Sequence, residues 1–268
     1  MNKEDLVSVI MPTYNAGKYL ADSMNSILNQ TYKNLELLIT DDASTDPTTL
    51  QLLEEYASKD ERVKILYLKE NHGAGYARNK SIERAKGRYI AFCDSDDRWT
   101  TDKLEKQIDF MNKKKCALTC ASYIIFDGET QDEIGFCTAP KKITYGMMKR
   151  DNKVGCLTAI YDVQMLGRKF FMPTIRKRQD WALFLQIIRE CKVCYAYPDK
   201  PLAYYCMRRN SISSNKMSLM KYNIAVYKEI LGFHPIKANL YFFTLFLPTY
   251  GAKILKRKFD SYTFTHHK

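Results

Sequence analysis

The sequence lacks the features that mark several common classes of protein. Its 268 residues contain no low-complexity tract and no internal repeat, and no charged-then-apolar segment opens the chain. The eight cysteines are scattered, without the framework of a small secreted domain, so we expect reduced thiols and a cytoplasmic location. Cys191 and Cys194 form one C-x-x-C pair, but zinc would need a second pair or suitably spaced histidines, so we predict structural thiols.

The C-terminal quarter has few acidic residues and no apolar run long enough to cross a bilayer. From residue 206 onward, 11 Lys and Arg face only Glu229 and Asp260, a net charge of +9 out of +12 for the chain. Residues 240–247 are strongly apolar, but Pro248 follows them, and a membrane span needs roughly 18 apolar residues. An aromatic-rich helix flanked by cations suits an anionic membrane surface; the alternative is a helix packed on the protein itself or on a second subunit.

Strands and helices alternate through the first 110 residues. Apolar, β-branched runs predict strands at 7–11, 35–39, 63–68 and 89–93. Helical spacing or helix-start signals predict helices at 17–30, from Pro47 with Asp46 as N-cap, and at 74–85. This alternation indicates βαβ units and a mostly parallel α/β sheet, in which ligands bind beyond the carboxyl ends of the strands.

The second half of the sequence is less regular. We expect a strand over 118–126, a polar, basic and mobile segment over 128–153, and a strand over 154–161 followed by a short helix ending at Gly167. An apolar helix is expected to begin within 176–181 and to run through Ile188.

Three acids follow the fourth predicted strand. Asp94, Asp96 and Asp97 surround Ser95 at the end of a buried run, where carboxylates repel one another and lose hydration. Folding alone does not explain this cluster, whereas a hard divalent cation does, because carboxylate oxygens are its natural ligands. The alternative is a turn or capping cluster ahead of a helix that starts near Thr101.

The other strand ends also carry polar or aromatic residues. Tyr14 could stack on a flat base or be a surface aromatic, and Asp42 could accept from a heterocycle N–H or be a turn residue. Arg78 could pair with a diphosphate or lie on a solvated helix face. Gly73 and Gly75 do not form a dinucleotide fingerprint, because Arg78 occupies the third glycine position and the motif follows the third strand.

Taken as a set, segments 7–15, 41–46, 73–79 and 94–96 resemble the inverting family 2 glycosyltransferases of the GT-A fold, over roughly residues 5–110. The resemblance implies a Rossmann-like sheet flanked by helices with a C-terminal helical extension, a UDP-sugar donor, and Mn²⁺ or Mg²⁺. It assigns Asp96, with Asp94, to the metal. The residues that it assigns to binding of the nucleotide-sugar are Pro12, Thr13, Tyr14, Asp42, Arg78, Asp94 and Ser95. Arg208 or Arg209 would join them from a loop that closes over the diphosphate. The resemblance gives Asp97 no firm role.

The resemblance also assigns a catalytic base. Asp180 lies in the first turn of a predicted helix, where the helix dipole favours a capping acid. In family 2 enzymes the matching Asp takes a proton from the acceptor, and many members have Glu where this chain has Gln179. Trp181 could stack on a sugar face or pack in the core.

The implied organisation is a catalytic domain over 1–215, with a nucleotide-sugar half (1–110) and an acceptor half (111–215), and a basic helical tail over 216–268. The implied reaction is metal-dependent transfer with inversion to a glycan or lipid-linked glycan in surface polysaccharide synthesis, such as capsule or lipopolysaccharide. Lipid-linked acceptors favour a membrane surface as partner of the tail, on the cytoplasmic face of the inner membrane.

Three other classes of protein remain as alternatives. The first is a non-catalytic nucleotide-binding protein on the same fold. The second is a nucleic-acid-binding protein, which we do not favour because the basic residues gather beside an apolar helix instead of forming a stripe with interleaved aromatics. The third is a nucleotidyltransferase, which usually has a Gly-rich, basic loop after its first strand, unlike residues 11–15.

Overall fold

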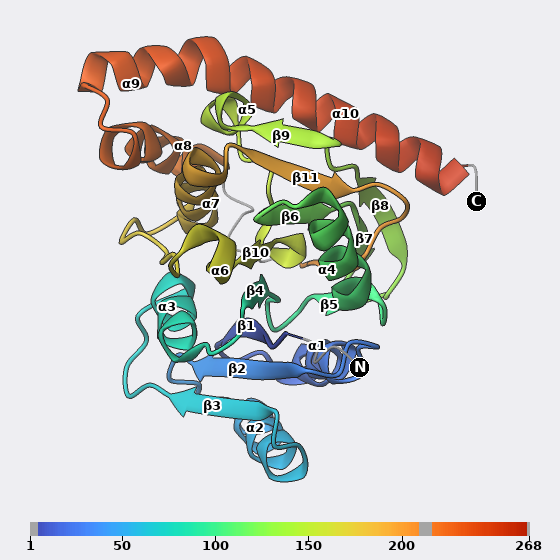
Figure 1. Ribbon diagram of the computed structural model, residues 1–268. Coiled ribbons are helices and arrows are strands. Elements are labelled where there is room, and N and C mark those ends of the chain that lie inside the picture. Colours follow the sequence, from blue (N-terminus) through green and yellow to red (C-terminus); the bar gives the residue numbers. More distant parts are fainter. Residues whose placement is uncertain (1–4, 209–215, 267–268) are drawn as a thin grey trace.

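The computed structural model describes residues 5–208 and 216–266 (Figure 1). A large sheet of eight strands runs through the molecule, with four of its seven strand pairs parallel. From edge to edge its strands are β3 (Val63–Tyr67), β2 (Leu35–Asp41), β1 (Val7–Thr13), β4 (Tyr89–Phe92), β10 (Ile160–Asp162), β6 (Leu118–Ala121), β11 (Val193–Tyr197) and β9 (Lys142–Thr144). This confirms the mostly parallel α/β sheet.

The three strands β1, β2 and β4 are buried along their whole length. Strands covered on both faces need continuous apolar runs, which is what the sequence provides here. The helices that flank the sheet are α1 (Leu20–Leu28), α2 (Pro47–Lys59), α3 (Ala74–Arg84), α4 (Lys103–Lys114), α6 (Val163–Leu166) and α7 (Gln179–Cys191), with the short turn η1 (Gly17–Tyr19) before α1.

A second, smaller sheet of four strands corrects the expected strand over 118–126. Its strands are, in order, β5 (Arg98–Trp99), β12 (Ala203–Met207), β7 (Tyr123–Asp127) and β8 (Glu133–Cys137). The apolar run divides at Ser122 into β6 and β7, which belong to different sheets. The Ser122 carbonyl accepts a hydrogen bond from Leu202 N (3.1 Å) and its hydroxyl accepts one from Ala139 N (3.0 Å), so partners distant in sequence fix the break.

The segment over 128–153, expected to be polar, basic and mobile, contains β8, β9 and α5 (Tyr145–Arg150), and β9 pairs with β11. One further expectation in the second half is wrong. The run over 154–161 is not one strand: it forms the short 3-10 turn η2 (Cys156–Thr158) and enters the sheet only as β10.

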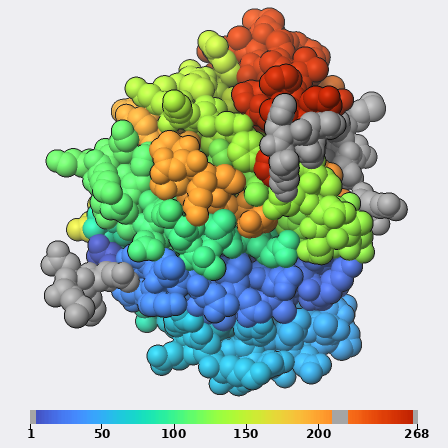
Figure 2. All heavy atoms as spheres, turned by 90° about the vertical axis from the view of Figure 1, so that its right-hand side faces the viewer, coloured from blue at the N-terminus to red at the C-terminus, as the bar shows by residue number. Residues whose placement is uncertain are grey.

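The C-terminal extension is helical, as expected. Its elements are α8 (Lys216–Ala225), the π-helical turn η3 (Val226–Ile230), α9 (Pro235–Tyr241), the π-helical turn η4 (Phe242–Phe246) and α10 (Leu247–His266). Figure 1 shows α9 to α10 as one long rod beside β9, and Figure 2 shows red atoms of these helices at the top of one face and blue atoms of the first part of the chain at its bottom. No helix within the described ranges has the length and apolar character to span a bilayer.

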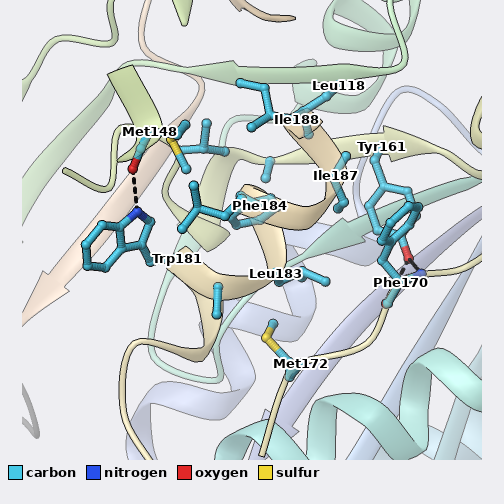
Figure 3. Close-up of a cluster of buried hydrophobic side chains, with 14 of the residues drawn as sticks. Leu118, Met148, Tyr161, Phe170, Met172, Trp181, Leu183, Phe184, Ile187 and Ile188 are labelled. Atoms are coloured by element: carbon cyan, nitrogen blue, oxygen red, sulfur yellow. Dashed lines mark hydrogen bonds between the residues drawn. The ribbon is translucent and has the colours of Figure 1, made fainter. Parts of the chain in front are cut away.

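The extension shares the core of the preceding residues. The fully buried ring of Trp181 packs against Tyr227 (5.7 Å between ring centroids) and Phe246 (5.3 Å), and its Nε1 donates to Met148 O at 2.7 Å (Figure 3). Phe242 belongs to the same cluster. The alternative of a helix packed on the protein therefore holds for this face of the extension, and Trp181 is a core residue, not a sugar platform.

Candidate functional site

The carboxyl ends of β1 and β2 are joined by Asn15. Thr13 pairs with Asp41 at the end of the ladder, so the two following loops leave the sheet side by side. Asn15 has a positive φ of 46°, and its Oδ1 accepts from Thr45 N (2.8 Å) and Asp46 N (2.9 Å). An Asn that leaves a strand in this conformation and bonds to neighbouring backbone is a recognisable signal, but the sequence reasoning overlooked it.

Asn15 thereby fixes the position of Tyr14, whose side chain is 51% exposed at the mouth of the site. Pro12 and Thr13 are buried in β1, and the Thr13 hydroxyl has no hydrogen-bond partner among the described residues. An exposed ring beside a backbone segment suits a flat ligand lying across the end of β1.

Asp42 connects the end of β2 to the start of α3. Its carboxylate is almost completely buried and accepts from the backbone N–H groups of His72 (2.8 Å) and Gly73 (2.7 Å). Each carboxylate oxygen retains a second acceptor position, so contact with a nucleotide base stays a prediction. The observed contacts give Asp42 a structural role in addition.

Arg78 reaches from α3 into the acidic segment and is not on a solvated helix face. Its guanidinium donates to Asp94 Oδ1 at 2.5 Å, its side chain is only 11% exposed, and its Nε has no partner in the described chain. Burial acts to lower the pKa of Arg78, but the charge of Asp94, with a smaller effect of Asp180, raises it overall. A buried, permanently charged donor with an unused N–H suits an anionic ligand.

Asp96 and Arg208 form the second ion pair of the site. Burial, followed by repulsion from Asp94, raises the pKa of Asp96, and Arg208 opposes this rise. Arg208 also lies over the ring of Tyr19, 5.3 Å from its centroid. The end of β12 thus brings one of the two proposed loop arginines to the acids, and Arg209 lies outside the described residues.

Asp97 has a structural connection that the sequence did not reveal. Its Oδ1 accepts from Cys206 N at 2.8 Å, which joins the acidic segment to β12. Burial, together with the charges of Asp96 and Asp94, raises the pKa of Asp97 well above its usual range. Ser95 lies between these acids and is partly exposed.

Asp180 lies partly buried in the first turn of α7, and its Oδ2 accepts from Asn152 Nδ2 at 2.8 Å. Its charge is among the smaller influences that raise the pKa of Arg78. Gln179 lies against α3, because a Cβ added to Gly75 would be 2.2 Å from its Oε1. The starts of α3 and α7 therefore meet at the site.

Asp94 and Asp96 fit a divalent cation whose remaining coordination positions are filled by a bound phosphate and water. Asp94 Oδ1 pairs with Arg78, and Asp96 Oδ2 pairs with Arg208. Over residues 5–208 and 216–266, no three His, Cys, Asp or Glu side chains converge as a closed metal site. Two carboxylates with phosphate oxygens and water are a common donor set for Mg²⁺, and a cation there would offset the repulsion that raises the pKa of Asp96.

Comparisons with known proteins agree with this geometry. The sequence model described as Glycosyl transferase family 2 matches residues 8–171, more than half of the chain. The chain belongs to this family. It is 43% identical over 240 residues to the Bacillus subtilis (strain 168) glycosyltransferase TuaG, named for teichuronic acid biosynthesis, covering 89% of this chain and 93% of that protein.

A second relative of this family 2 glycosyltransferase is named for a lipid-linked acceptor. Escherichia coli WfgD, a UDP-Glc:α-D-GlcNAc-diphosphoundecaprenol β-1,3-glucosyltransferase, is 38% identical over 216 residues, covering 81% of this chain and 83% of that protein. Resemblance to bacterial surface-polysaccharide glycosyltransferases is therefore confirmed.

Solved structures show the same fold at low sequence identity. Staphylococcus aureus TarS 1–349 in complex with UDP-GlcNAc has a TM-score of 0.67 and 22% identity, covering 88% of this chain and 70% of that one. The Pyrobaculum calidifontis mannosyltransferase PcManGT in complex with GDP-Man and Mn²⁺ has a TM-score of 0.66 and 17% identity, covering 95% and 75%. These similarities establish the GT-A fold.

Proposed function

We propose that this glycosyltransferase transfers a sugar from a UDP-sugar to a hydroxyl of a lipid-linked glycan, with inversion, during synthesis of a surface polysaccharide. The observation that carries the proposal is the contact between Gly75 at the start of α3 and Gln179 at the start of α7, because Arg78 and Asp180 follow these two residues within one helical turn. The names of WfgD and TuaG support the donor, the acceptor class and the type of polymer.

In this mechanism Tyr14 stacks on the base, with Asp42 as a further contact, and Pro12 and Thr13 line the nucleotide. Arg78 and Arg208 face the diphosphate. Mn²⁺ or Mg²⁺ held by Asp96 and Asp94 would supply positive charge to the departing diphosphate. Asp180 accepts the proton of the acceptor hydroxyl as that oxygen attacks the anomeric carbon from the face opposite the leaving group.

The decisive variant is Asp180→Asn, which keeps the shape of the side chain and removes its basicity. We expect transfer to fall at least ~10²–10⁴-fold, the usual contribution of a general base, while UDP affinity measured by calorimetry is unchanged. A screen of UDP-, GDP- and dTDP-sugars with Mn²⁺ would identify the donor. Near-normal transfer by Asp180→Asn would remove Asp180 from the role of base, and no donor cleavage by the native protein would favour the non-catalytic alternative.

The metal assignment has a separate test. We expect Asp96→Ala to lose the Mn²⁺-dependent part of UDP binding, measured by calorimetry with and without the metal. The control is Asp109→Ala, because Asp109 is an exposed acid of α4 that pairs with Lys113 on the same helix. Unchanged Mn²⁺ dependence in Asp96→Ala would remove Asp96 from the metal site.

We propose further that the outer face of the C-terminal rod binds an anionic membrane, on the cytoplasmic side of the inner membrane. Exposed apolar side chains recur there at spacings of three, four or eight residues. The row, called the apolar row below, consists of Ile236 (76% exposed), Leu240, Phe243, Leu247, Leu255, Phe259 and Tyr262. Such a face suits the boundary between headgroups and acyl chains, and the net charge of +9 from residue 206 onward complements anionic lipid.

Vesicle cosedimentation tests this membrane proposal. We expect binding to vesicles that contain anionic lipid and weaker binding to purely zwitterionic vesicles, with a loss of binding as salt rises. Equal binding to both vesicle types would remove the electrostatic part of the proposal.

A further inference from the structure

Asn152 holds the carboxylate of Asp180 in one orientation. Its Nδ2 donates to Asp180 Oδ2 at 2.8 Å, and its Oδ1 accepts from Val154 N at 3.2 Å. The second bond fixes which end of the Asn152 amide faces Asp180, because Val154 N is a donor and needs the carbonyl end. The amide N–H takes one acceptor position of Oδ2, and no described residue donates to Oδ1 of Asp180, which makes Oδ1 the less occupied oxygen for an acceptor hydroxyl.

The backbone around Asn152 is held from α10. Lys253 Nζ donates to the carbonyl oxygen of Asn152 at 2.6 Å and lies 3.1 Å from Asp151 Oδ2. Lys153 pairs with the same Asp151 oxygen at 2.9 Å, and the Asp151 side chain is only 3% exposed. A buried carboxylate shared by two lysines is costly to disrupt, because removal of a partner leaves charge under-compensated in the interior.

The helix that precedes this loop is held on two sides as well. Trp181 of α7 donates to Met148 O at 2.7 Å, as Figure 3 shows, and Tyr227 of η3 donates through its hydroxyl to Lys149 O at 2.7 Å. The end of α5 is therefore fixed between α7 and the C-terminal extension. The loop that carries Asn152 leaves from this fixed end.

We propose that Asn152 is a positioning residue for Asp180, and that Lys253 of α10 holds Asn152 in place. The inference rests on the proposed function, in which Asp180 is the base. Without the Asn152 bond, the Asp180 carboxylate loses the hydrogen-bond donor that holds Oδ2, and its orientation toward the acceptor is no longer fixed. The helix α10, which carries the second part of the apolar row, is thereby connected to the reacting group through two side chains.

The test uses the full chain, purified UDP-sugar and lipid-linked acceptor, with rates normalised to UDP-binding sites counted by calorimetry, so that unfolded protein does not contribute. We expect Asn152→Ala and Asn152→Asp to lower kcat by about 10- to 100-fold, the scale of a small misplacement of a catalytic group, with the KM for donor unchanged. Asn152→Gln, which keeps the amide donor, should recover part of the rate.

Lys253→Met keeps the aliphatic stem and removes the charge, and we expect a smaller loss of kcat in the same direction. Combined with Asn152→Ala it should add no further loss, because both changes release the same side chain. The control is Lys113→Met, which removes an exposed lysine paired with Asp109 on α4, and its kcat should equal that of the native enzyme.

The outcomes separate the two proposals. An inactive Asp180→Asn together with normal kcat in both Asn152→Ala and Asn152→Asp overturns the positioning role and leaves the proposed function intact. Additive losses in the Asn152→Ala, Lys253→Met double variant overturn the link to α10. An active Asp180→Asn overturns the proposed base itself.

Discussion

Phe243 and Phe246 are near neighbours in η4, but Phe243 faces solvent and Phe246 faces the core. Substitution of each by Ala separates the proposed membrane binding of the C-terminal rod from its contribution to stability. Phe246 is 3% exposed and stacks near Trp181, Phe242 and Tyr250, with ring centroids 5.3–5.6 Å away. Phe→Ala at such a site costs about 3–5 kcal/mol, from lost burial and the cavity left behind. We expect Phe246→Ala to reduce the free energy of unfolding by this amount in urea or guanidinium titrations.

Phe243→Ala should affect membrane binding instead. The ring is 54% exposed, and a side chain of roughly 200 Å² then offers about 100 Å² to the lipid. At ~25 cal/mol per Å² this is at most about 2.5 kcal/mol, or a loss of up to roughly 70-fold in vesicle partitioning. The free energy of unfolding should fall by no more than about 2 kcal/mol, because only the buried half of the side chain, which includes the edge contact with Phe242, is lost from the fold.

The result that would refute this reasoning is specific. If Phe243→Ala binds anionic vesicles as tightly as the native protein, the apolar row does not enter the membrane. If Phe246→Ala is as stable as the native protein, the rod does not share the core around Trp181. Unfolding should be followed in detergent-free buffer and cosedimentation at fixed salt, so that the two readouts stay independent.

Two further predictions concern other parts of the molecule. Burial lowers the pKa of Lys103 from 10.5 to about 7. Between about pH 7 and 10 the unfolded chain therefore holds a proton on Lys103 that the folded chain lacks. The buried group destabilises the fold by at most about 5 kcal/mol at pH 7 and below, and by less as the pH rises. Lys103→Met should stabilise most at pH 6–7 in denaturant titrations, with the gain shrinking toward pH 10; a gain independent of pH would contradict the shifted pKa. Gly75→Ala should displace Gln179 and thereby lower the free energy of unfolding. In a double-mutant cycle followed by denaturation, this loss of stability should disappear when Gln179 is also replaced by Ala. Additive losses would show that the two residues do not touch.

Local sequence patterns predicted the first half of the fold because each element there is specified by its own residues. The apolar run from Val7 forms β1, and Asp46 caps α2 by accepting from Thr49 N at 2.9 Å, as expected. The second half depended on distant contacts. Nothing within 118–126 marks Ser122 as the point where the chain changes sheets, because its partners lie near residues 139 and 202.

The candidate site was likewise predictable where local residues specify it and unpredictable where it depends on distant contacts. The acids after β4 and the arginine of α3 were visible as residue types at strand ends, since parallel strands bring those ends together. Their pairings were not visible. Arg208 reaches Asp96 only because β12 joins the second sheet, and Asn152 reaches Asp180 only because α5 is fixed against α7. Trp181 could not be assigned from sequence, since its neighbours Tyr227 and Phe246 follow it by 46 and 65 residues.

That late arrival of partners has a consequence for the synthesis of the protein. A chain made from its N-terminus can pair β1, β2 and β4 early, whereas Trp181 stays without Phe246, and Asn152 without Lys253, until the ribosome has added those residues. The rod formed by α9, η4 and α10 also carries the apolar row. One stretch of chain therefore supplies both the residues that hold the proposed base in place and the face proposed to meet lipid, so that a nascent enzyme gains the two together.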